Sequence, residues 1–326
     1  MSTPTFSHSS TADEVAAAFA GEIRGKNVLI TGTSLNGLGF ETARSVAKFG
    51  AGLVIITGRT RERLVLAEDA LRAEIPGANI RALVLDLASL ESVRTAAAEV
   101  NAYPEHIDIL INNAASSIAP FRLTPDGFEH QIATDHLGPF LLTGLLLPKL
   151  RAAPHPHTPR VVYVASGAHA WCAGVDLRAI EHPREGEREY NGMQAYARAK
   201  SANILTAKEL TRRARGRVLG FSVTPGAVKT NFGENDETRA ELMRLGIITA
   251  DGTPTSGVTF DWKTPPQGAA TIIAAGFDPA LTATPGCYLA DSVQNDQRVA
   301  PHSNDLVMAE KLWELSERLV ELTYAF

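Results

Sequence analysis

A tyrosine and a lysine stand four residues apart near the middle of the chain, in the run Tyr196-Ala197-Arg198-Ala199-Lys200. On a helix this spacing puts both side chains on one face, so the ammonium group can lie near the phenol. A free phenol has a pKa of about 10, and a nearby cation lowers that value toward the range useful for proton transfer. The same spacing is also common on solvated helix faces, so the pair predicts acid–base chemistry only together with other features.

A glycine-rich stretch lies far upstream, between a short apolar run and an amphipathic segment. Gly32 would permit a tight turn, Gly37 would let the backbone approach a phosphate, and Gly39 would let the next helix pack closely. The helix N-terminus would favour the pyrophosphate of a dinucleotide. An ordinary strand-to-helix turn is the alternative, and later features disfavour it. The predicted cofactor contacts in this stretch are Gly32, Ser34, Asn36, Gly37, Leu38 and Gly39.

Short apolar runs alternate with amphipathic stretches from residue 27 onward, a pattern typical of strands joined by helical crossovers. The runs predict strands at 27–30, 53–57, 80–85, 107–111, 160–164, 219–223 and 286–289. The amphipathic stretches predict a helix at 306–322 and others that begin near Gly39, Arg61, Ser89, Thr124, Gly138 and Tyr190. We therefore predict the α/β class, with a single doubly wound parallel sheet, helices on both faces, and ligands beyond the carboxyl ends of the strands.

The composition excludes several classes of protein. The chain has 326 residues, 44% of them hydrophobic, which is enough for a sizeable core, and its net charge of -5 offers no general attraction to nucleic acid or anionic membranes. The longest apolar run, at 140–147, is well short of the ~20 residues that span a bilayer. Two cysteines, Cys172 and Cys287, have no zinc spacing and suit a reducing compartment. We expect a cytoplasmic protein with no nucleic-acid partner and no integral membrane segment.

The chain divides into three predicted parts. Residues 1–24 form a flexible leader with a short helix, 25–326 form a single dinucleotide-binding catalytic domain, and a substrate lid lies near 231–266. His155 and His157 stand in a proline-rich connection without nearby carboxylates, so we predict no metal site. The lid suggests a fairly hydrophobic substrate, because it contains Phe232, Leu242, Met243, Phe260 and Trp262.

Polar side chains close several of the predicted strands. The third strand ends in Asp86-Leu87, where a carboxylate could bind an adenine amino group, and the fifth ends beside the hydroxyl of Ser166. The fourth strand ends in the run Asn112-Asn113-Ala114-Ala115, and the sixth is followed by Thr224-Pro225-Gly226. Because these ends meet at one edge of a parallel sheet, we expect function to cluster there.

This ordered set of motifs resembles the short-chain dehydrogenase/reductase family over nearly the whole chain, from about Gly25 onward. It is similar in particular to the branch that contains retinol dehydrogenases and the catalytic domain of the WW-domain-containing oxidoreductase. That closer resemblance rests on the long spacing between Ser166 and Tyr196 and on the runs DGFE at 126–129, HLG at 136–138, FLLT at 140–143 and KSAN at 200–203. The resemblance implies a Rossmann-type fold.

The resemblance also implies a role for each matching residue. Tyr196 would exchange a proton with the substrate oxygen, Ser166 would hydrogen-bond that oxygen, and Lys200 would lower the pKa of the phenol and hold the nicotinamide ribose. Hydride transfer would belong to the cofactor. Together with Tyr196 and Lys200, further cofactor contacts would come from Asp86, Leu87, Asn113, Ala114, Ala115, Pro225, Gly226, Val228 and Thr230.

The end of the second predicted strand indicates which nicotinamide cofactor is used. Sites that select NAD usually carry a carboxylate here for the ribose hydroxyls, and Gly58 supplies none. Arg59 instead offers a guanidinium group, which suits the 2′-phosphate of NADP. The alternative is a surface arginine that caps the strand. We predict NADP(H).

Three departures from the family pattern stand out. Four residues instead of three separate Gly32 from Gly37, so the loop must bulge, and Ala115 replaces a glycine near the nicotinamide side. Asp135 stands where the family has a catalytic asparagine that holds a water linked to the lysine. An ionised Asp135 would favour protonated Lys200 and oppose phenolate at Tyr196, which predicts a working but retuned proton relay.

The combined prediction is an NADP(H)-dependent oxidoreductase that interconverts a carbonyl and an alcohol on a small, largely apolar substrate, in the reducing direction, with Tyr196 as general acid/base. One alternative is a cofactor-binding protein with little turnover that acts as a sensor or interaction partner. Another is a reductase of an activated C=C bond. The expected partner is the small-molecule substrate, and a homodimer or homotetramer stays open because the apolar helices could pack in a core or between subunits.

Overall fold

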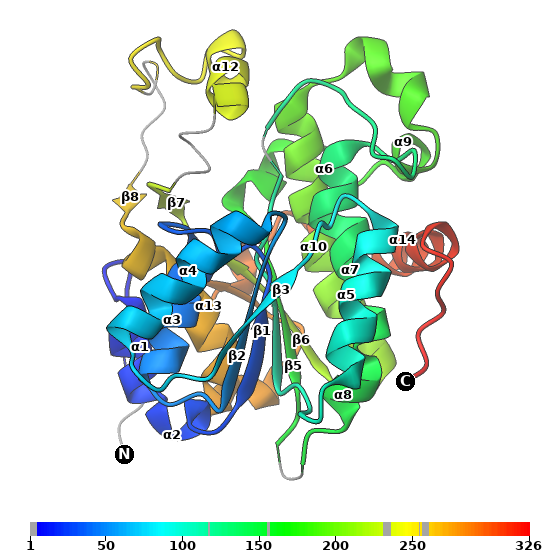
Figure 1. Ribbon diagram of the computed structural model, residues 1–326. Helices are drawn as coiled ribbons and strands as arrows, with labels where there is room; N and C mark the ends of the chain where they lie inside the picture. The colour runs from blue at the N-terminus through cyan, green and yellow to red at the C-terminus, as the bar shows by residue number, and fades with distance from the viewer. Residues whose placement is uncertain (1–4, 117, 155–156, 231–235, 254, 256–260) are drawn as a thin grey trace.

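An eight-stranded sheet forms the centre of the molecule (Figure 1). The computed structural model describes residues 5–116, 118–154, 157–230, 236–253, 255 and 261–326. The sheet order is β10-β9-β6-β5-β4-β1-β2-β3, and the neighbours are parallel except for the pair of β10 and β9. Because the winding direction reverses between β1 and β4, the predicted doubly wound parallel sheet is confirmed. The strands are β1 (Asn27–Ile30), β2 (Leu53–Gly58), β3 (Ile80–Val84), β4 (Ile109–Asn112), β5 (Arg160–Val164), β6 (Leu219–Thr224), β9 (Tyr288–Ala290) and β10 (Val293–Gln294).

Helices cover both faces of this sheet, as Figure 1 shows. Successive residues of a strand point to opposite faces, so Val28 and Ile30 join one apolar core and Leu29 joins the other. The first core is covered by α1 (Ala12–Ala18), α3 (Leu38–Lys48), α4 (Arg61–Glu74) and α13 (Pro265–Phe277). The second is covered by α5 (Leu90–Ala102), α7 (Gly138–Leu145), α10 (Gly192–Ala214) and α14 (Leu306–Leu319).

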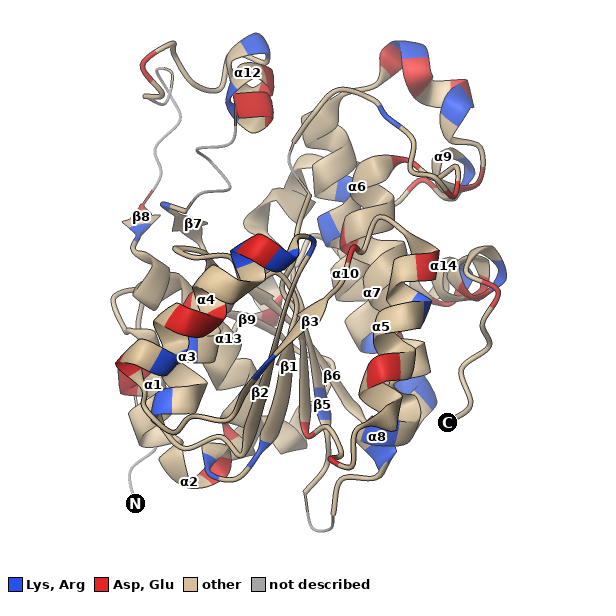
Figure 2. Cartoon of the chain, viewed as in Figure 1, with Lys and Arg blue, Asp and Glu red and all other residues tan. Residues whose placement is uncertain are grey.

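Smaller elements surround these two layers. They are α2 (Ala20–Ile23), α6 (His130–Ile132), α8 (Leu147–Arg151), α9 (Leu177–Glu181), α12 (Asp236–Arg244) and the parallel pair β7 (Ala227–Val228) and β8 (Trp262–Lys263). In Figure 2 the charged residues lie mainly on the outer helices and loops, while the strands are mostly uncharged. Within the part of the chain that the structure describes, no helix is both long and apolar enough to cross a membrane.

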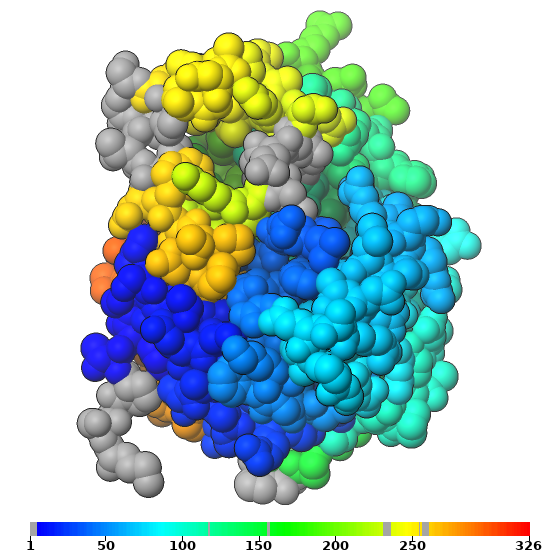
Figure 3. Space-filling model, turned by 60° about the vertical axis from the view of Figure 1, so that its left-hand side comes forward, coloured from blue at the N-terminus to red at the C-terminus, as the bar shows by residue number. Residues whose placement is uncertain are grey.

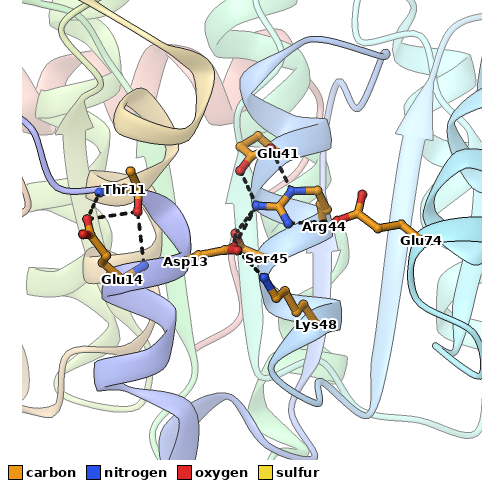
Figure 4. A network of polar contacts seen from close by, with 8 residues as sticks. All are labelled: Thr11, Asp13, Glu14, Glu41, Arg44, Ser45, Lys48 and Glu74. Carbon is orange, nitrogen blue, oxygen red and sulfur yellow. Dashed lines mark hydrogen bonds and ion pairs between the residues drawn. The ribbon is translucent and has the colours of Figure 1, made fainter.

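Polar contacts join the first helix to its neighbours (Figure 4). The Arg44 guanidinium on α3 contacts Asp13 of α1 at 2.7 Å, Glu41 at 2.7 Å and Glu74 of α4 at 3.1 Å. Lys48 Nζ adds a second contact to Asp13 at 2.6 Å. The division into a leader at 1–24 and a catalytic domain stays a prediction, but α1 packs on α3 and α13 as part of the layer that covers the sheet.

Several predicted elements are corrected by the structure: the strand predicted at 107–111 begins at Ile109, and the helix predicted at 306–322 ends at Leu319. The helix expected near Thr124 is wrong, because residues 124–128 form a turn in which the Thr124 N–H donates to the Phe128 carbonyl and Gly127 has φ 85°. The first helix there is α6, which starts six residues later at His130. The last parallel strand begins at Tyr288 instead of residue 286, because Gly286 adopts φ 87° in the preceding turn.

Candidate active site

Helix α10 carries Tyr196 and Lys200 on one face, as the spacing predicts. The Lys200 Nζ lies 5.4 Å from the centre of the Tyr196 ring. Lys200 is 2% exposed, and Tyr196 is partly buried. Asn191 caps the start of the helix, because its side chain accepts the N–H groups of Met193 and Gln194 at 3.0 and 3.1 Å. The helix therefore begins about one turn before the tyrosine.

Ser166 lies at the carboxyl end of β5, two residues after the strand ends. Its side chain hydrogen-bonds Tyr196, and its Oγ accepts the N–H of Ala168 at 3.1 Å at the start of a 3-10 turn (Gly167–Trp171). Because α10 packs on both β5 and β6, the serine and the tyrosine meet at the same edge of the sheet. The structure therefore brings together Ser166, Tyr196 and Lys200.

Asp135 contacts Lys200 directly. Its Oδ2 lies 3.1 Å from the Lys200 Nζ, and both side chains are almost fully buried. Asp135 lies in a π-helical turn (Ala133–Leu137), a kind of irregularity that often marks functional sites. Its Oδ1 accepts the backbone N–H of Ser116 at 2.7 Å, and the Lys200 Nζ also donates to the Val164 carbonyl at 3.1 Å. The carboxylate thus holds the ammonium group by a direct ion pair.

The charges around the phenol shift the pKa of Tyr196 in a way that the sequence predicted only in part. Burial raises the pKa of Tyr196, Lys200 lowers it, and Asp135 raises it again, so the net pKa is above the ordinary value. Lys200 lowers the pKa of the phenol as predicted, but burial and Asp135 outweigh it, so the net shift is upward. Burial opposes the charge of Lys200, but Asp135 and Tyr196 together raise the pKa of the lysine.

The glycine loop after β1 packs as tightly as the motif requires. A Cβ on Gly39 would lie 2.4 Å from the Gly32 carbonyl oxygen and 2.6 Å from the Asn113 Nδ2, and one on Gly32 would lie 2.8 Å from Ala114. Asn113 itself donates to the Thr31 and Gly32 carbonyls at 2.8 and 3.0 Å. These contacts tie the glycine loop to the end of β4, so a side chain at either glycine would displace the loop.

The extra residue in this loop is absorbed by a left-handed turn. Asn36 has φ 62°, a conformation that asparagine tolerates better than most residues, and the Gly37 N–H donates to the Ser34 carbonyl at 3.1 Å. Gly37 then caps α3, which begins at Leu38. The predicted bulge therefore leaves the helix N-terminus directly beyond β1, where it can face a phosphate.

The other candidate cofactor residues follow neighbouring strands at the same edge. Arg59 is exposed directly after β2, and Asp86 is partly buried after β3, where its Oδ1 accepts the Ala88 N–H at 3.0 Å. After β6, Gly226 has φ 86°, and a Cβ there would lie 3.2 Å from the buried side chain of Lys263. Leu87 follows β3, Ala114 and Ala115 follow β4, and Pro225 follows β6, while Val228 lies in β7 and Thr230 comes two residues after it; their contacts with a cofactor stay predictions.

Comparison with known proteins agrees with this arrangement. The sequence matches the short chain dehydrogenase family over residues 26–172. Retinol dehydrogenase 14 from Homo sapiens is 35% identical over 316 residues, which cover 93% of this chain and 88% of the relative. The chain belongs to the short-chain dehydrogenase/reductase family. Its resemblance to the retinol dehydrogenase branch is confirmed by the same alignment.

Another relative and two solved structures resemble the chain over most of its length. The short-chain dehydrogenase TIC 32 A, chloroplastic, from Brassica napus is 32% identical over 323 residues, which cover 97% of this chain and 94% of the relative. An uncharacterized protein from Mycobacterium paratuberculosis has a crystal structure with a TM-score of 0.66 and 29% identity, covering 94% of this chain and 97% of its own. A short chain dehydrogenase from Escherichia coli CFT073, complexed with NADPH, has a TM-score of 0.61 at 19% identity and covers 83% and 98%.

A nicotinamide cofactor fits the residues present in this short-chain dehydrogenase. The close packing at Gly32 and Gly39 holds the glycine loop against the end of β4, and the N-terminus of α3 begins directly after this loop, where its free N–H groups suit a pyrophosphate. Lys200 and Tyr196 lie beyond the ends of the neighbouring strands. We conclude that the chain is built as an oxidoreductase with a nicotinamide site across the switch point of the sheet.

Some residues of the site have no local sequence signal. His169 is 1% exposed, with Nδ1 2.7 Å from the Ser166 carbonyl and Nε2 accepting the Ala300 N–H at 3.1 Å. Burial lowers the pKa of His169, so the neutral ring holds the loop that carries the catalytic serine against residue 300. The two residues are 131 apart in the chain. Only the folded chain brings them together.

His157, one of the two histidines considered as metal ligands, lies far from the candidate active site. His157 Nε2 lies 3.5 Å from the Asp108 carboxylate at the amino ends of the strands, away from the cofactor edge, and His155 lies outside the described residues. No group of three or more His, Cys, Asp or Glu that could hold a metal ion is found in the described ranges. The assignment of no metal stays a prediction.

Proposed function

We propose that this short-chain dehydrogenase uses NADP(H) to interconvert a carbonyl and an alcohol on a small, largely apolar molecule, in the reducing direction. The observation that carries the proposal is the meeting of Ser166, Tyr196 and Lys200 at the edge of the sheet that also holds the glycine loop. When bound, the cofactor would supply the hydride. The chain's own residues would bind the substrate oxygen and supply its proton.

Each of the three side chains has a distinct task in this proposal. The Ser166 hydroxyl would donate a hydrogen bond to the substrate carbonyl oxygen and orient it. Tyr196 would give its phenolic proton to that oxygen as negative charge develops there. Because burial and Asp135 raise the pKa of Tyr196, the phenol is protonated at neutral pH and can donate its proton in the proposed reduction. The Lys200 ammonium would stabilise the phenolate left behind.

Asp135 is proposed as the fourth member of this set. Its carboxylate holds the Lys200 ammonium at 3.1 Å and is itself fixed by the Ser116 N–H. This arrangement would keep the lysine charged and aimed at the phenol, and it would raise the energy of the phenolate. We expect a working enzyme whose proton transfer is tuned toward alkaline pH.

The preference for NADP is proposed from the end of β2. Arg59 is exposed beside Gly58, and no carboxylate stands at either position. The NADPH complex of the Escherichia coli relative is in line with this choice. The predicted apolar substrate finds support in the partly exposed Met243 and Trp262 of the predicted lid and in the retinol named by human relatives.

The first experiment follows NADPH consumption at 340 nm across a panel of apolar aldehydes and ketones, beside NADH and beside Tyr196→Phe. We expect oxidation that depends on the substrate, prefers NADPH and is lost in Tyr196→Phe while NADPH binding persists. Turnover that survives in Tyr196→Phe would refute the assignment of the general acid. A cofactor-binding protein with little turnover is the second candidate, favoured only by the Asp135–Lys200 pair, and it predicts NADPH binding without consumption.

Three further expectations stay predictions. The described chain contains no bilayer-spanning helix, and a cytoplasmic location is not tested by that observation. The small-molecule substrate is the one partner that the site requires. A homodimer or homotetramer is consistent with the family fold, and it calls for a measurement of mass in solution.

A further inference from the structure

The N-terminus of the catalytic helix α10 is held by contacts from three other segments. Its first residue, Gly192, lies one turn before Tyr196. The Asn191 cap occupies the N–H groups of Met193 and Gln194. The Gly192 carbonyl accepts the Gln131 Nε2 at 2.9 Å, from the short helix α6 that leads into the turn with Asp135.

Gly192 also lies close to the segment after β4 and to helix α12. A Cβ at this position would lie 2.6 Å from the Ala119 carbonyl oxygen, in the segment after β4, and 3.3 Å from the Glu241 Oε1, on α12. A larger residue would therefore separate these segments. The third segment, α12, belongs to the predicted lid.

The Glu241 carboxylate is placed to interact with this helix N-terminus. Glu241 is 4% exposed although it belongs to a short outer helix. Arg244 contacts it at 2.7 and 2.6 Å, and this contact together with the Gly192 N–H holds its pKa below the ordinary value. A carboxylate is stabilised by the free N–H groups and the positive dipole end at the start of a helix.

Two more contacts dock α12 on the same region. The Thr238 hydroxyl accepts the Ile118 N–H at 3.2 Å, and Glu237 contacts the Arg122 guanidinium at 3.0 Å. Ile118 follows Ser116, whose N–H holds Asp135. In Figure 3 the yellow atoms of this part of the chain lie against green atoms at the top of the molecule. The helix therefore touches both segments that position the catalytic groups.

We propose that Glu241 is a positioning residue, whose carboxylate docks α12 on the start of α10 and so couples the cover of the substrate site to the placement of Tyr196. The inference rests on the proposed function, because it gives α12 the task of covering a substrate. Docking at Gly192 and at Ile118 would fix α10 and the turn with Asp135 relative to one another. The catalytic groups would then be fully aligned only when α12 is seated.

The test compares Glu241→Ala and Glu241→Gln with Asp236→Asn, which removes a carboxylate from an exposed position of the same helix. Amide hydrogen exchange at Gly192 reports docking without any substrate. We expect exchange at Gly192 to become at least about tenfold faster in Glu241→Ala, to change less in Glu241→Gln, and to stay unchanged in Asp236→Asn. Unchanged exchange in Glu241→Ala would overturn the proposal, whatever the enzyme's activity.

The second readout concerns Tyr196. We expect Glu241→Ala to lower kcat about tenfold while the Kd for NADPH stays within about twofold, and Glu241→Gln to recover most of that loss. If no substrate of the panel turns over, the ionisation of Tyr196, followed by ultraviolet difference spectra against Tyr196→Phe, replaces kcat. We then expect its pKa to fall toward the ordinary phenol value as water enters. Faster exchange at Gly192 with no change at Tyr196 would overturn the coupling, and a lack of turnover alone would count only against the proposed function.

Discussion

Two charged groups, Lys200 and Asp135, lie near the candidate proton donor Tyr196, and their opposite effects help to set the pKa of its phenol. Lys200 lies 5.4 Å from the Tyr196 ring centre, and Asp135 lies 3.1 Å from the lysine. Because the side chains of Lys200 and Asp135 are almost fully buried, each charge acts on its neighbours more strongly than it would at the surface. The residue in the family's asparagine position is therefore the natural place to test the tuning of the site.

Asp135→Asn removes a charge that raises the pKa of Tyr196. We expect the pKa of the phenol to fall, so the alkaline limb of kcat/KM for carbonyl reduction moves to lower pH by about one unit. The pH profile of NADPH oxidation measures this shift. Asp126→Asn, the same change outside the site, serves as the control, and a profile that is identical in Asp135→Asn and wild type would refute the retuned relay.

Arg59 carries the proposed choice between the two nicotinamide cofactors. Arg59→Leu removes the guanidinium that would pair with the 2′-phosphate, so the KM for NADPH should rise about tenfold or more while the KM for NADH changes little. The matched control is Arg61→Leu, which removes another exposed arginine two residues along the chain. Equal effects of the two substitutions on NADPH would show that Arg59 is only a surface residue.

Helix α1 depends on polar as well as apolar contacts to stay on the layer formed by α3, α4 and α13. Asp13 is the centre of the polar set, since it accepts from Arg44, Ser45 and Lys48. Burial alone would raise the pKa of Asp13, but the hydrogen bonds from these three residues lower it to about 2. The ionised carboxylate is therefore part of the folded state.

Asp13→Asn should lower the free energy of unfolding at pH 7 by about 1–2 kcal/mol. The folded-state pKa of about 2 lies below the ordinary aspartate value of 3.8 that holds in the unfolded chain, so this stabilisation is complete above pH 3.8 and is lost as the pH falls through 2. Urea unfolding of both proteins at pH 7 and near pH 2.5 measures the effect. A difference in stability that stays constant over this range would contradict the role of the charge.

Across the whole molecule, the elements that follow strong local patterns could be predicted. β1 and β5 have the predicted bounds, because continuous apolar runs are buried on both faces of a parallel sheet. Ser166, Tyr196 and Lys200 meet as predicted, because strand ends and a helical spacing of four place them. The glycine loop could be predicted because its glycines stand directly between a buried strand and a helix.

Features that depend on distant contacts could not be predicted. The turn at 124–128 overrides a helical pattern through a hydrogen bond between Thr124 and Phe128, and β10 pairs antiparallel at the edge of the sheet. Asp135 contacts Lys200 directly from within a π-helical turn, and no pattern in the sequence predicts that turn. The position of Glu241 beside Gly192 depends on a contact between α12 and the start of α10, which are far apart in the sequence. Each of these needs the folded chain.

The most direct measurement follows a deuterium atom from the C4 position of NADPH into the product of an apolar carbonyl substrate, by mass spectrometry in a single turnover. We expect one deuterium on the product carbon with wild-type protein, and we expect Tyr196→Phe to bind the cofactor without forming labelled product. With NADPH deuterated at both C4 positions, retention of both labels by a wild-type protein that binds cofactor and substrate would contradict the assignment as a reductase.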